Sequence, residues 1–477
     1  MSQALAAELC GHDAITLARL LRSRQVSARE VIDAHIERIE ATNPAINAIV
    51  TATFEAATAK AAAADEALAR GEAAGLLHGL PVAHKDLTET AGVRTTYGSP
   101  LFAQNVPARD ALIVRRMAGA GAISLGKTNT PEFGAGSHTV NPLFGATRNP
   151  YDHGRSAGGS SGGAGAALAA RMICLADGSD LGGSLRNPAS FNNVVGLRPS
   201  PGRVPVWPFA DVADTMSVQG PMARTVADVA LLLAVISGPD PGVPLALDQP
   251  PPPLTAPEQV TGLLTGDLAG LRVAWSIDLG LPVQRDVTAT LAPARQLLAD
   301  LGAHVVDAAP SLAGADDIFR TRRALGFATR FGPLLREHAS QLGPNVTWNT
   351  QRGLELTVAD LSRITGLQAT LAERITRFFA DFDVLACPVS QVVPFDVGLD
   401  WVHEIDGVPQ HTYLDWMASC YLISATGLPA MSVPAGFTPG GLPVGLQLVG
   451  RRRGEWDLLR VAHAFEAATG YGRRGPA

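Results

Sequence analysis

The spacing of apolar residues predicts two helices in the first seventy positions of the chain. Ser27 and Glu30 have the spacing of a capping box, and the positions expected to face the core recur at helical intervals after it: Val31, Ile32, His35, Ile36 and Ile39. The pair Asn43–Pro44 is expected to end this helix, because proline lacks the backbone donor that a helix interior needs. The Ala-rich segment 52–70 is expected to form the next helix.

From residue 80 onward, short apolar runs alternate with helical segments. GLPVAHK (79–85), AISLGKT (122–128) and MICLAD (172–177) are typical of buried strands, whereas 110–120 and 164–172 have helical patterns. This alternation predicts an α/β/α sandwich around a large mixed or largely parallel sheet.

The second half of the chain continues the same pattern. It predicts amphipathic helices over 224–237 and 286–302, a strand in 271–280, an exposed loop at Pro250–Pro253, a hairpin over 431–450 and a closing helix over 455–468. We expect one large domain over 1–477, with a core at about 75–200 and a variable, substrate-shaping insertion at about 310–410.

Composition excludes several classes of protein. Apolar residues make up 46% of the chain and charged residues 17%, with a formal net charge of −6, so neither a nucleic-acid footprint nor a disordered chain is indicated. The four cysteines lie far apart, and the histidines show no ligand spacing, so we expect no metal and no cofactor. With no signal peptide and no long apolar run, a cytoplasmic protein without a membrane partner is expected.

Three residues carry the candidate chemistry. Ser160 lies in GGSSGG (158–163), Ser184 follows two glycines in GSDLGGSLRNP (178–188), and Lys85 ends the apolar run 79–85. A glycine-rich serine loop alone is more often a turn, and a lysine alone is more often on the surface. Together they suit acyl transfer, in which one serine attacks, the other relays protons and a desolvated lysine is the base.

At these residues the chain resembles the amidase signature family of serine hydrolases. The resemblance extends through segments that cover nearly the whole chain: GKTNTPEF (126–133), NPLFGATRNP (141–150), GLRP (196–199) and GLPAMSVPAGF to GLPVGLQLVG (427–450). It departs from the usual family pattern at Ser179, Arg198 and His84, none of which removes a catalytic group.

The resemblance implies the roles of the site residues. Ser184 is the expected nucleophile, Ser160 the proton relay, reached through a cis peptide from Gly159, and Lys85 the base. The expected oxyanion hole and substrate-binding residues are Leu181, Gly182, Gly183 and Gly134, with Asp180, Arg186 and Ser161 in support.

The residues around Lys85 favour this role. A base must be neutral, so burial would have to lower the pKa of Lys85, and the apolar flank GLPVA supplies that setting. Strand alternation is expected to turn Asp86 and His84 to the opposite face, which makes a structural role for His84 the better interpretation. Asp180 and Arg186 are expected to form a buried ion pair that holds the glycine loop.

The substrate is the least determined part of the prediction. Aromatic residues gather in segments that are expected to be variable, and this favours an apolar or aryl amide, anilide or carbamate over a charged substrate. These segments are 97–102, 204–209 with Trp207, 313–350, and 395–413 with Trp401 and His403. Two alternatives stay open, the glutaminase subunit of a tRNA-dependent amidotransferase and a non-catalytic binding protein. The partner is expected to be a small molecule, and a homodimer is the expected assembly.

Overall fold

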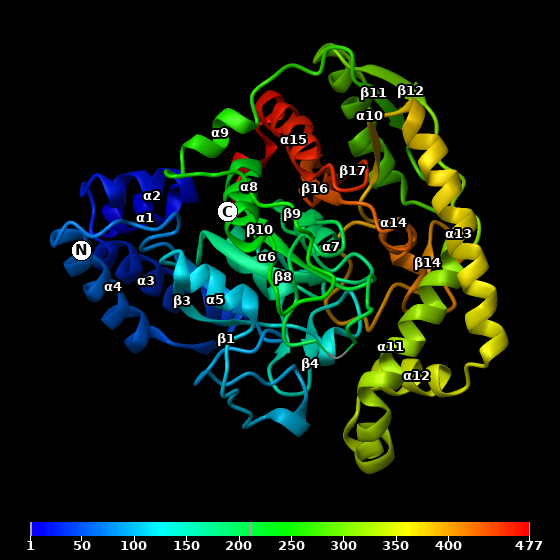
Figure 1. The fold of residues 1–477 in the computed structure, drawn as a ribbon, viewed down its shortest axis with the longest axis horizontal. Coiled ribbons are helices and arrows are strands. Elements are labelled where there is room, and N and C mark those ends of the chain that lie inside the picture. The colour runs from blue at the N-terminus through cyan, green and yellow to red at the C-terminus, as the bar shows by residue number, and fades with distance from the viewer. Residues whose placement is uncertain (1, 210, 477) are drawn as a thin grey trace.

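The computed structural model describes residues 2–209 and 211–476, and a mixed sheet of eleven strands runs through them (Figure 1). The strands of this sheet are β1 (Ile49–Ala52), β2 (Pro81–Lys85), β3 (Ile123–Thr128), β8 (Leu175–Asp180), β9 (Val195–Arg198), β10 (Val218–Ala223), β11 (Arg272–Trp275), β12 (His304–Asp307), β13 (Val384–Pro388), β16 (Ala430–Phe437) and β17 (Pro443–Gly450). Three short hairpins accompany it: β4 (Val140–Asn141) with β5 (Gly145–Ala146), β6 (Arg148–Asn149) with β7 (Asp152–Ser156), and β14 (Glu404–Ile405) with β15 (Val408–Pro409).

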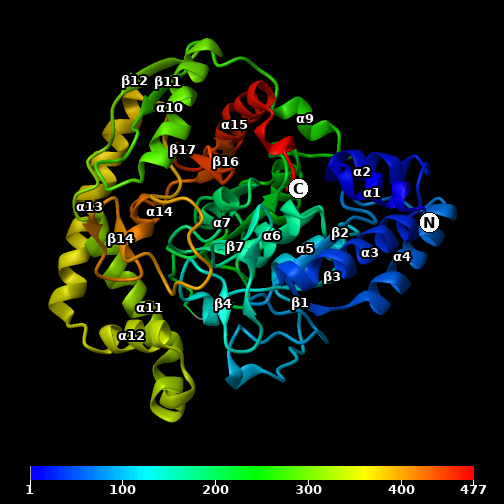
Figure 2. The ribbon, with the colours of Figure 1, turned by 180° about the vertical axis from the view of Figure 1, so that it is seen from behind.

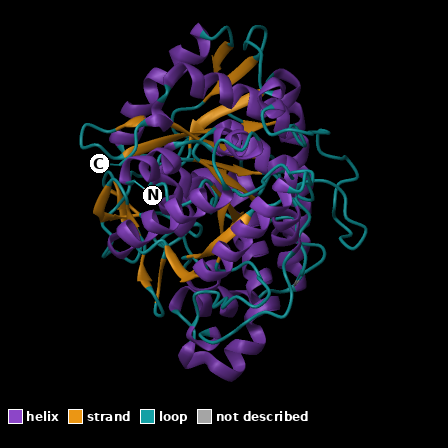
Figure 3. Cartoon of the chain, turned by 90° about the vertical axis from the view of Figure 1, so that its left-hand side faces the viewer, coloured by secondary structure: helices purple, strands orange, loops and turns teal. Residues whose placement is uncertain are grey.

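The strand order in the large sheet is β1-β3-β2-β8-β10-β9-β16-β17-β13-β11-β12. Parallel triplets (β3, β2 and β8; β13, β11 and β12) flank an antiparallel middle, and β1 joins the edge in antiparallel orientation. Helices cover both sides of the strands (Figure 3). The predicted sandwich around a mixed sheet is therefore confirmed, as is the C-terminal hairpin.

The helices have the following bounds: α1 (Gln3–Gly11), α2 (Ala14–Arg22), α3 (Ala28–Ile46), α4 (Phe54–Ala69), α5 (Leu112–Gly119), α6 (Gly162–Ala169), α7 (Arg186–Phe191), α8 (Val226–Ile236), α9 (Gln259–Leu263), α10 (Arg285–Asp300), α11 (Ala315–His338), α12 (Pro344–Leu354), α13 (Val358–Asp381), α14 (Ala418–Ser424) and α15 (Glu455–Thr469). Helices α11, α12 and α13 lie together on the side of the molecule away from the N-terminal helices (Figures 1 and 2). They fall within the predicted insertion at about 310–410, whose variability stays a prediction.

The helix α3 does not end where its sequence predicts. It begins at the predicted capping box, with the Ser27 side chain bonded to the Glu30 amide, but it continues past Pro44 to Ile46. The proline removes only its own donor from the ladder. The Asn43 side chain then accepts hydrogen bonds from the amides of Ala48 and Ile49, at 2.8 and 2.9 Å, and stabilises the chain just beyond the helix end.

Two other predicted elements differ in character or position. The helix α8 is buried almost all round rather than amphipathic, because it lies between the strands β9 and β10 and the helices α2, α5 and α15. The strand predicted at 172–177 is instead β8, three residues further on. The reason is its partner β10, which pairs with it from Leu175 to Asp180 and brings Asp180 into the ladder.

Candidate active site

Lys85 is the last residue of β2, and its side chain is fully buried. Every residue of this strand is buried, since β2 lies between β3 and β8 in the sheet. The Lys85 Nζ atom lies 2.7 Å from Ser160 Oγ, 2.9 Å from Ser161 Oγ and 3.0 Å from Ser179 Oγ. A buried amine surrounded by hydroxyl groups rather than carboxylates loses much of the stabilisation of its charged form.

The environment of Lys85 makes its neutral form accessible. Burial lowers the pKa of Lys85 to about 7, and the charges of Asp177 and Asp180 oppose this shift. This environment agrees with the expectation from the sequence that burial lowers the pKa of Lys85 enough for its neutral amine to act as a base at physiological pH.

Ser160 lies in the turn that leads into α6, two residues before the helix begins. The peptide between Gly159 and Ser160 is cis, as the family resemblance implies. Ser160 is 2% exposed. The turn presents Ser160 and Ser161 together to the Lys85 amine.

Ser184 follows the loop that leaves β8 and is 9% exposed, more than the other two residues of the predicted triad. Its carbonyl oxygen accepts a hydrogen bond of 3.2 Å from the Ser161 amide, which ties the two serine loops to each other. The structure thus joins Lys85 to Ser160 through their side chains, and it places Ser184 next to Ser161 through a backbone hydrogen bond.

The glycine loop between Leu181 and Ser184 is shaped by Asp180. The Asp180 carboxylate accepts hydrogen bonds from the Gly183 amide at 2.9 Å and the Leu185 amide at 3.1 Å. Gly183 has φ of +117°, and a Cβ there would lie 2.6 Å from that of Cys420, so only glycine fits. The Gly183 amide is therefore engaged by Asp180, which removes it from the predicted set of free oxyanion donors. Within the described chain the amides of Leu181, Gly182 and Ser184 have no hydrogen-bond partner.

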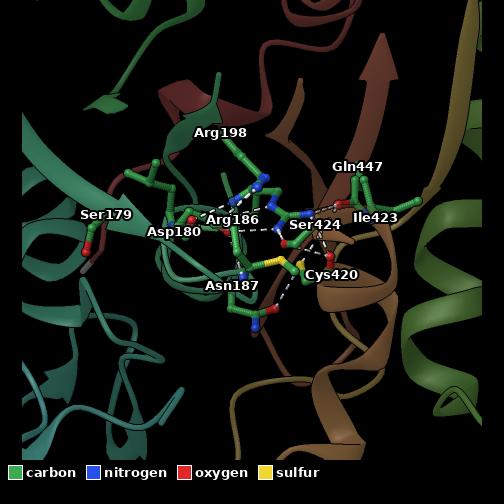
Figure 4. A network of polar contacts seen from close by, with 12 residues as sticks. Ser179, Asp180, Arg186, Asn187, Arg198, Cys420, Ile423, Ser424 and Gln447 are labelled. Carbon is green, nitrogen blue, oxygen red and sulfur yellow. Dashed lines mark hydrogen bonds and ion pairs between the residues drawn. The ribbon is translucent and has the colours of Figure 1, made fainter. Parts of the chain in front are cut away.

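The predicted ion pair between Asp180 and Arg186 is present and fully buried, with 2.9 Å between Arg186 Nη2 and Asp180 Oδ1 (Figure 4). Arg198, which the sequence marked only as a departure, lies 3.3 Å from the same oxygen. Burial alone would raise the pKa of Asp180, but the two guanidinium groups hold it well below its usual range. Arg186 also donates to Gln447 and Ser424, so this network joins the glycine loop to β17 and α14.

Sequence reasoning missed several partners of Lys85. Ser179 has its hydroxyl in contact with the Lys85 amine although it was noted only as an unusual residue, and Asp177 was not singled out at all. His84 does not reach the serines. Its Nδ1 lies 2.7 Å from Asp177 Oδ1, in a buried pair. The register of the strands explains this pair, since β2 and β8 are parallel with Ala83 opposite Ala176, which places His84 beside Asp177; the sequence alone carries no signal for that register.

Gly134, expected in the substrate pocket, lies against Ser160. A Cβ on Gly134 would lie 3.4 Å from Ser160 Oγ and 3.0 Å from Leu87, and the residue has φ of +73°. The adjoining Phe133 belongs to an aromatic cluster from three segments, whose other members are Tyr97, Phe102 and Phe331. Phe319 stacks on Tyr421, and its ring lies against Gly182. An aromatic residue therefore lies next to Gly134 in sequence, and another packs against Gly182 of the glycine loop.

Two of the predicted aromatic residues pack elsewhere. The Trp207 ring is covered by the guanidinium groups of Arg109 and Arg115, at 4.9 and 4.8 Å from the ring centre. Trp401 packs on His403 with 3.9 Å between ring centres. The Trp207 contacts join its loop to α5 and the chain before it, whereas the Trp401 contact is local.

The rest of the described chain adds no competing centre. Residues 2–209 and 211–476 contain no cluster of His, Cys, Asp or Glu fit to hold a metal ion, and the four cysteines are buried thiols. No helix among the described residues is long and apolar enough to span a membrane.

A buried amine among serine hydroxyls, next to a loop with free backbone amides, is a site built for nucleophilic attack on an acyl group. The model of the Amidase family matches residues 30–459, so the chain belongs to the amidase family. It is 37% identical over 480 residues to an acylamidase of Rhodococcus erythropolis, covering 97% of both chains. It is also 38% identical over 486 residues to a subunit of the glutamyl-tRNA(Gln) amidotransferase of Moorella thermoacetica, covering 96% of this chain and 97% of the other. Among solved structures, a bacterial aryl acylamidase superposes with a TM-score of 0.89 at 30% identity, covering 97% of both chains.

Proposed function

We propose that this amidase hydrolyses the C–N bond of a carboxamide through an acyl-enzyme on Ser184. The observation that carries the proposal is the position of the Lys85 amine, buried and 2.7 Å from Ser160 Oγ. An amine with a pKa of about 7 is neutral in a large fraction of molecules at neutral pH and is then able to accept a proton.

The proposed sequence of proton transfers uses all three residues. As Ser184 Oγ attacks the carbonyl carbon, its proton passes to Ser160 while the Ser160 proton passes to Lys85. The C–N bond then breaks, and the leaving nitrogen takes a proton back along the same path. In the second half, water attacks the ester and gives its proton through Ser160 to Lys85; as the acid leaves, that proton returns through Ser160 to Ser184 Oγ, which restores the free serine.

The oxyanion would be held by backbone amides of the glycine loop. Leu181, Gly182 and Ser184 supply the donors proposed here, since Asp180 engages the Gly183 amide. Each such donor contributes about 2.7–4 kcal/mol to the transition state in comparable acyl-transfer sites. The ion network of Asp180 with Arg186 holds the loop in this shape.

We propose aryl amides and aryl carbamates as the substrate class. Phe133 adjoins Gly134, and the Phe319 ring lies against Gly182 of the glycine loop, so aromatic residues next to the proposed site suit an apolar or ring-bearing group beside the reacting carbonyl. The named activities of the acylamidase and the aryl acylamidase relatives support the same class. A substrate of this kind requires no cofactor.

The test compares p-nitroanilides and a p-nitrophenyl carbamate with simple aliphatic amides, in wild type, Ser184→Ala and Lys85→Ala. We expect turnover of the aryl substrates that both substitutions abolish. Full activity in Ser184→Ala would refute the mechanism, whereas hydrolysis of aliphatic amides alone would refute the aryl specificity.

A second candidate function rests on the relative from the tRNA-dependent amidotransferase, which is as similar in sequence as the acylamidase. That function requires glutamine as the ammonia donor and partner subunits. The stand-alone reaction is favoured by the aromatic residues Phe133 and Phe319 beside Gly134 and Gly182, because glutamine is polar. Glutaminase activity with inert aryl amides would reverse this order.

We propose a homodimer as the assembly, which sedimentation would test.

A further inference from the structure

The residues on both sides of Ser160 are fixed by hydrogen bonds. After it in the chain, the Ser161 amide donates to the Ser184 carbonyl oxygen at 3.2 Å. Before it, the Gly159 carbonyl oxygen accepts a hydrogen bond of 3.1 Å from the Ser137 hydroxyl. The first of these bonds leads directly to the loop of the proposed nucleophile, and the second leads there through one more side chain.

That side chain belongs to Asn187, the second residue of α7. Its Nδ2 atom donates to Ser137 Oγ at 3.2 Å, and its backbone amide donates to the Gly183 carbonyl oxygen at 2.7 Å. A Cβ on Gly183 would lie 2.9 Å from Asn187 Nδ2, so the side-chain amide packs directly against the glycine loop. Asn187 therefore holds the chain before Ser184 with its backbone and, through Ser137, the turn before Ser160 with its side chain.

The directions of these hydrogen bonds are consistent with one another. A serine hydroxyl has one proton to donate, and Ser137 gives it to Gly159, so the Ser137 oxygen needs a donor, which Asn187 Nδ2 supplies. The other side of the amide, Asn187 Oδ1, faces Cys420 with 3.6 Å to its Sγ atom (Figure 4). Asn187 is fully buried and Ser137 is 3% exposed, so solvent is excluded from the bridge between the two loops.

We propose that Asn187, acting through Ser137, is a positioning residue that holds the Ser160 turn against the Ser184 loop during acyl transfer. This inference rests on the proposed function, in which the proton of Ser184 passes to Ser160. That transfer requires the two hydroxyl oxygens to come within hydrogen-bond reach of each other. A misplacement of about 1 Å in such a site can lower the rate by about 10²-fold, so a buried bridge between the loops is expected to affect turnover.

The first test breaks the bridge from either end. Asn187→Ala removes the donor, and Ser137→Ala removes the hydroxyl that carries the link on to Gly159. In both variants we expect kcat for a p-nitroanilide to fall by about 10- to 100-fold, with KM unchanged, because the bridge orients the relay rather than the substrate. The double variant should be no slower than the slower single variant, since both substitutions remove the same link.

The second test separates a positioning role from a loss of folded enzyme. The nitrogen of an anilide must take a proton from the relay as it leaves, whereas p-nitrophenolate leaves from an ester without one. The release of coloured product in the first turnover is therefore compared for a p-nitroanilide and a p-nitrophenyl ester of the same acid. We expect the two variants to slow the anilide more than the ester, whereas a lower folded fraction would reduce both signals equally.

Asn43→Ala is the matched control. The Asn43 side chain accepts hydrogen bonds from the amides of Ala48 and Ile49 and donates to the Ile49 carbonyl oxygen at 2.9 Å. It hydrogen-bonds to neither serine loop. We expect this variant to unfold at a lower denaturant concentration than the wild type and to keep the wild-type ratio of anilide to ester rates.

Equal losses on the ester and the anilide, additive losses in the double variant, or a wild-type kcat in both single variants would each overturn the proposal. Ser137→Ala is the smaller change and carries the test if Asn187→Ala does not fold. Both variants keep Lys85, Ser160 and Ser184. Full activity of Ser184→Ala, which would refute the proposed function, is therefore a separate result.

Discussion

Two lysines are fully buried at the C-terminal ends of the neighbouring strands β2 and β3, and the hydrogen-bond partners of their amines differ. Lys85 ends β2 and Lys127 lies one residue before the end of the adjacent β3, with His84 opposite Lys127 in the register. Among the described residues, the Lys85 amine is hydrogen-bonded to serine hydroxyls alone. The Lys127 amine donates to the Thr88 carbonyl and to Thr90 Oγ1.

Burial lowers the pKa of both lysines, to about 7 for Lys85 and to about 8 for Lys127. The charges of Asp86 and Asp177 oppose this shift at Lys127, and those of Asp177 and Asp180 oppose it at Lys85. The comparison shows that burial by itself does not make a lysine a catalytic base. Lys85 contacts three serine hydroxyls, whereas Lys127 contacts a backbone carbonyl and one hydroxyl, and we propose that this difference separates a proton relay from a structural tie.

Replacing Lys85 should have the largest effect on activity. Lys85→Met keeps the length of the stem and removes the base, so we expect kcat/KM to fall by about 10³-fold or more. The measurement is hydrolysis of a p-nitroanilide by enzyme whose folded fraction is checked by circular dichroism. A loss below tenfold would place Lys85 in the same structural class as Lys127.

Lys127→Met should show the reverse pattern. The Thr88 carbonyl and the Thr90 hydroxyl lose a buried donor, and Asp86 loses a neighbouring positive charge, so the free energy of unfolding should fall by about 3 kcal/mol. Denaturant unfolding measures this loss. The kcat/KM of the folded fraction should change less than tenfold, and a loss as large as that of Lys85→Met would erase the contrast between the two lysines.

The pH dependence of the wild type sharpens the contrast further. The pKa of Lys85 is lowered, so the active neutral form accumulates as pH rises through about 7, and kcat/KM should fall about tenfold per unit below that value. Stopped assays between pH 5 and 9 with a neutral substrate measure this fall on the acid side of the profile. If Lys127→Met leaves the acid side unchanged, the titrating group is not Lys127. A flat wild-type profile would contradict a lysine base.

Ser179→Ala should have the smallest effect of the four. It removes one of three hydroxyl contacts to the Lys85 amine, at 3.0 Å, without touching Ser160. We expect kcat/KM to change by about fivefold, in line with one hydrogen bond. Ser161→Ala is the matched variant at 2.9 Å. A total loss in either would show that the relay runs through a serine other than Ser160.

The sequence predicts the sandwich, the positions of the glycine-rich loops and the ion pair of Asp180 with Arg186, since these depend on periodicity and motif residues. It does not predict the contact of Ser179 with Lys85 or the pairing of His84 with Asp177, because both depend on the register of β2 against β8. The sequence also does not predict the hydrogen bond from the Gly183 amide to Asp180, because it depends on how the loop folds back on the end of the strand. The predicted end of α3 at Asn43–Pro44 was wrong because a proline near the end of a helix removes only one backbone hydrogen bond.

The most direct test of the account is to identify the acylated residue. Enzyme quenched during turnover of a slow p-nitrophenyl carbamate is digested and its peptides are sequenced by mass spectrometry. The account predicts one carbamoyl group on Ser184 in the wild type and none in Ser184→Ala, with accumulation slowed in Lys85→Met. A carbamoyl group on Ser160, or turnover with no covalent intermediate in wild type, would contradict it.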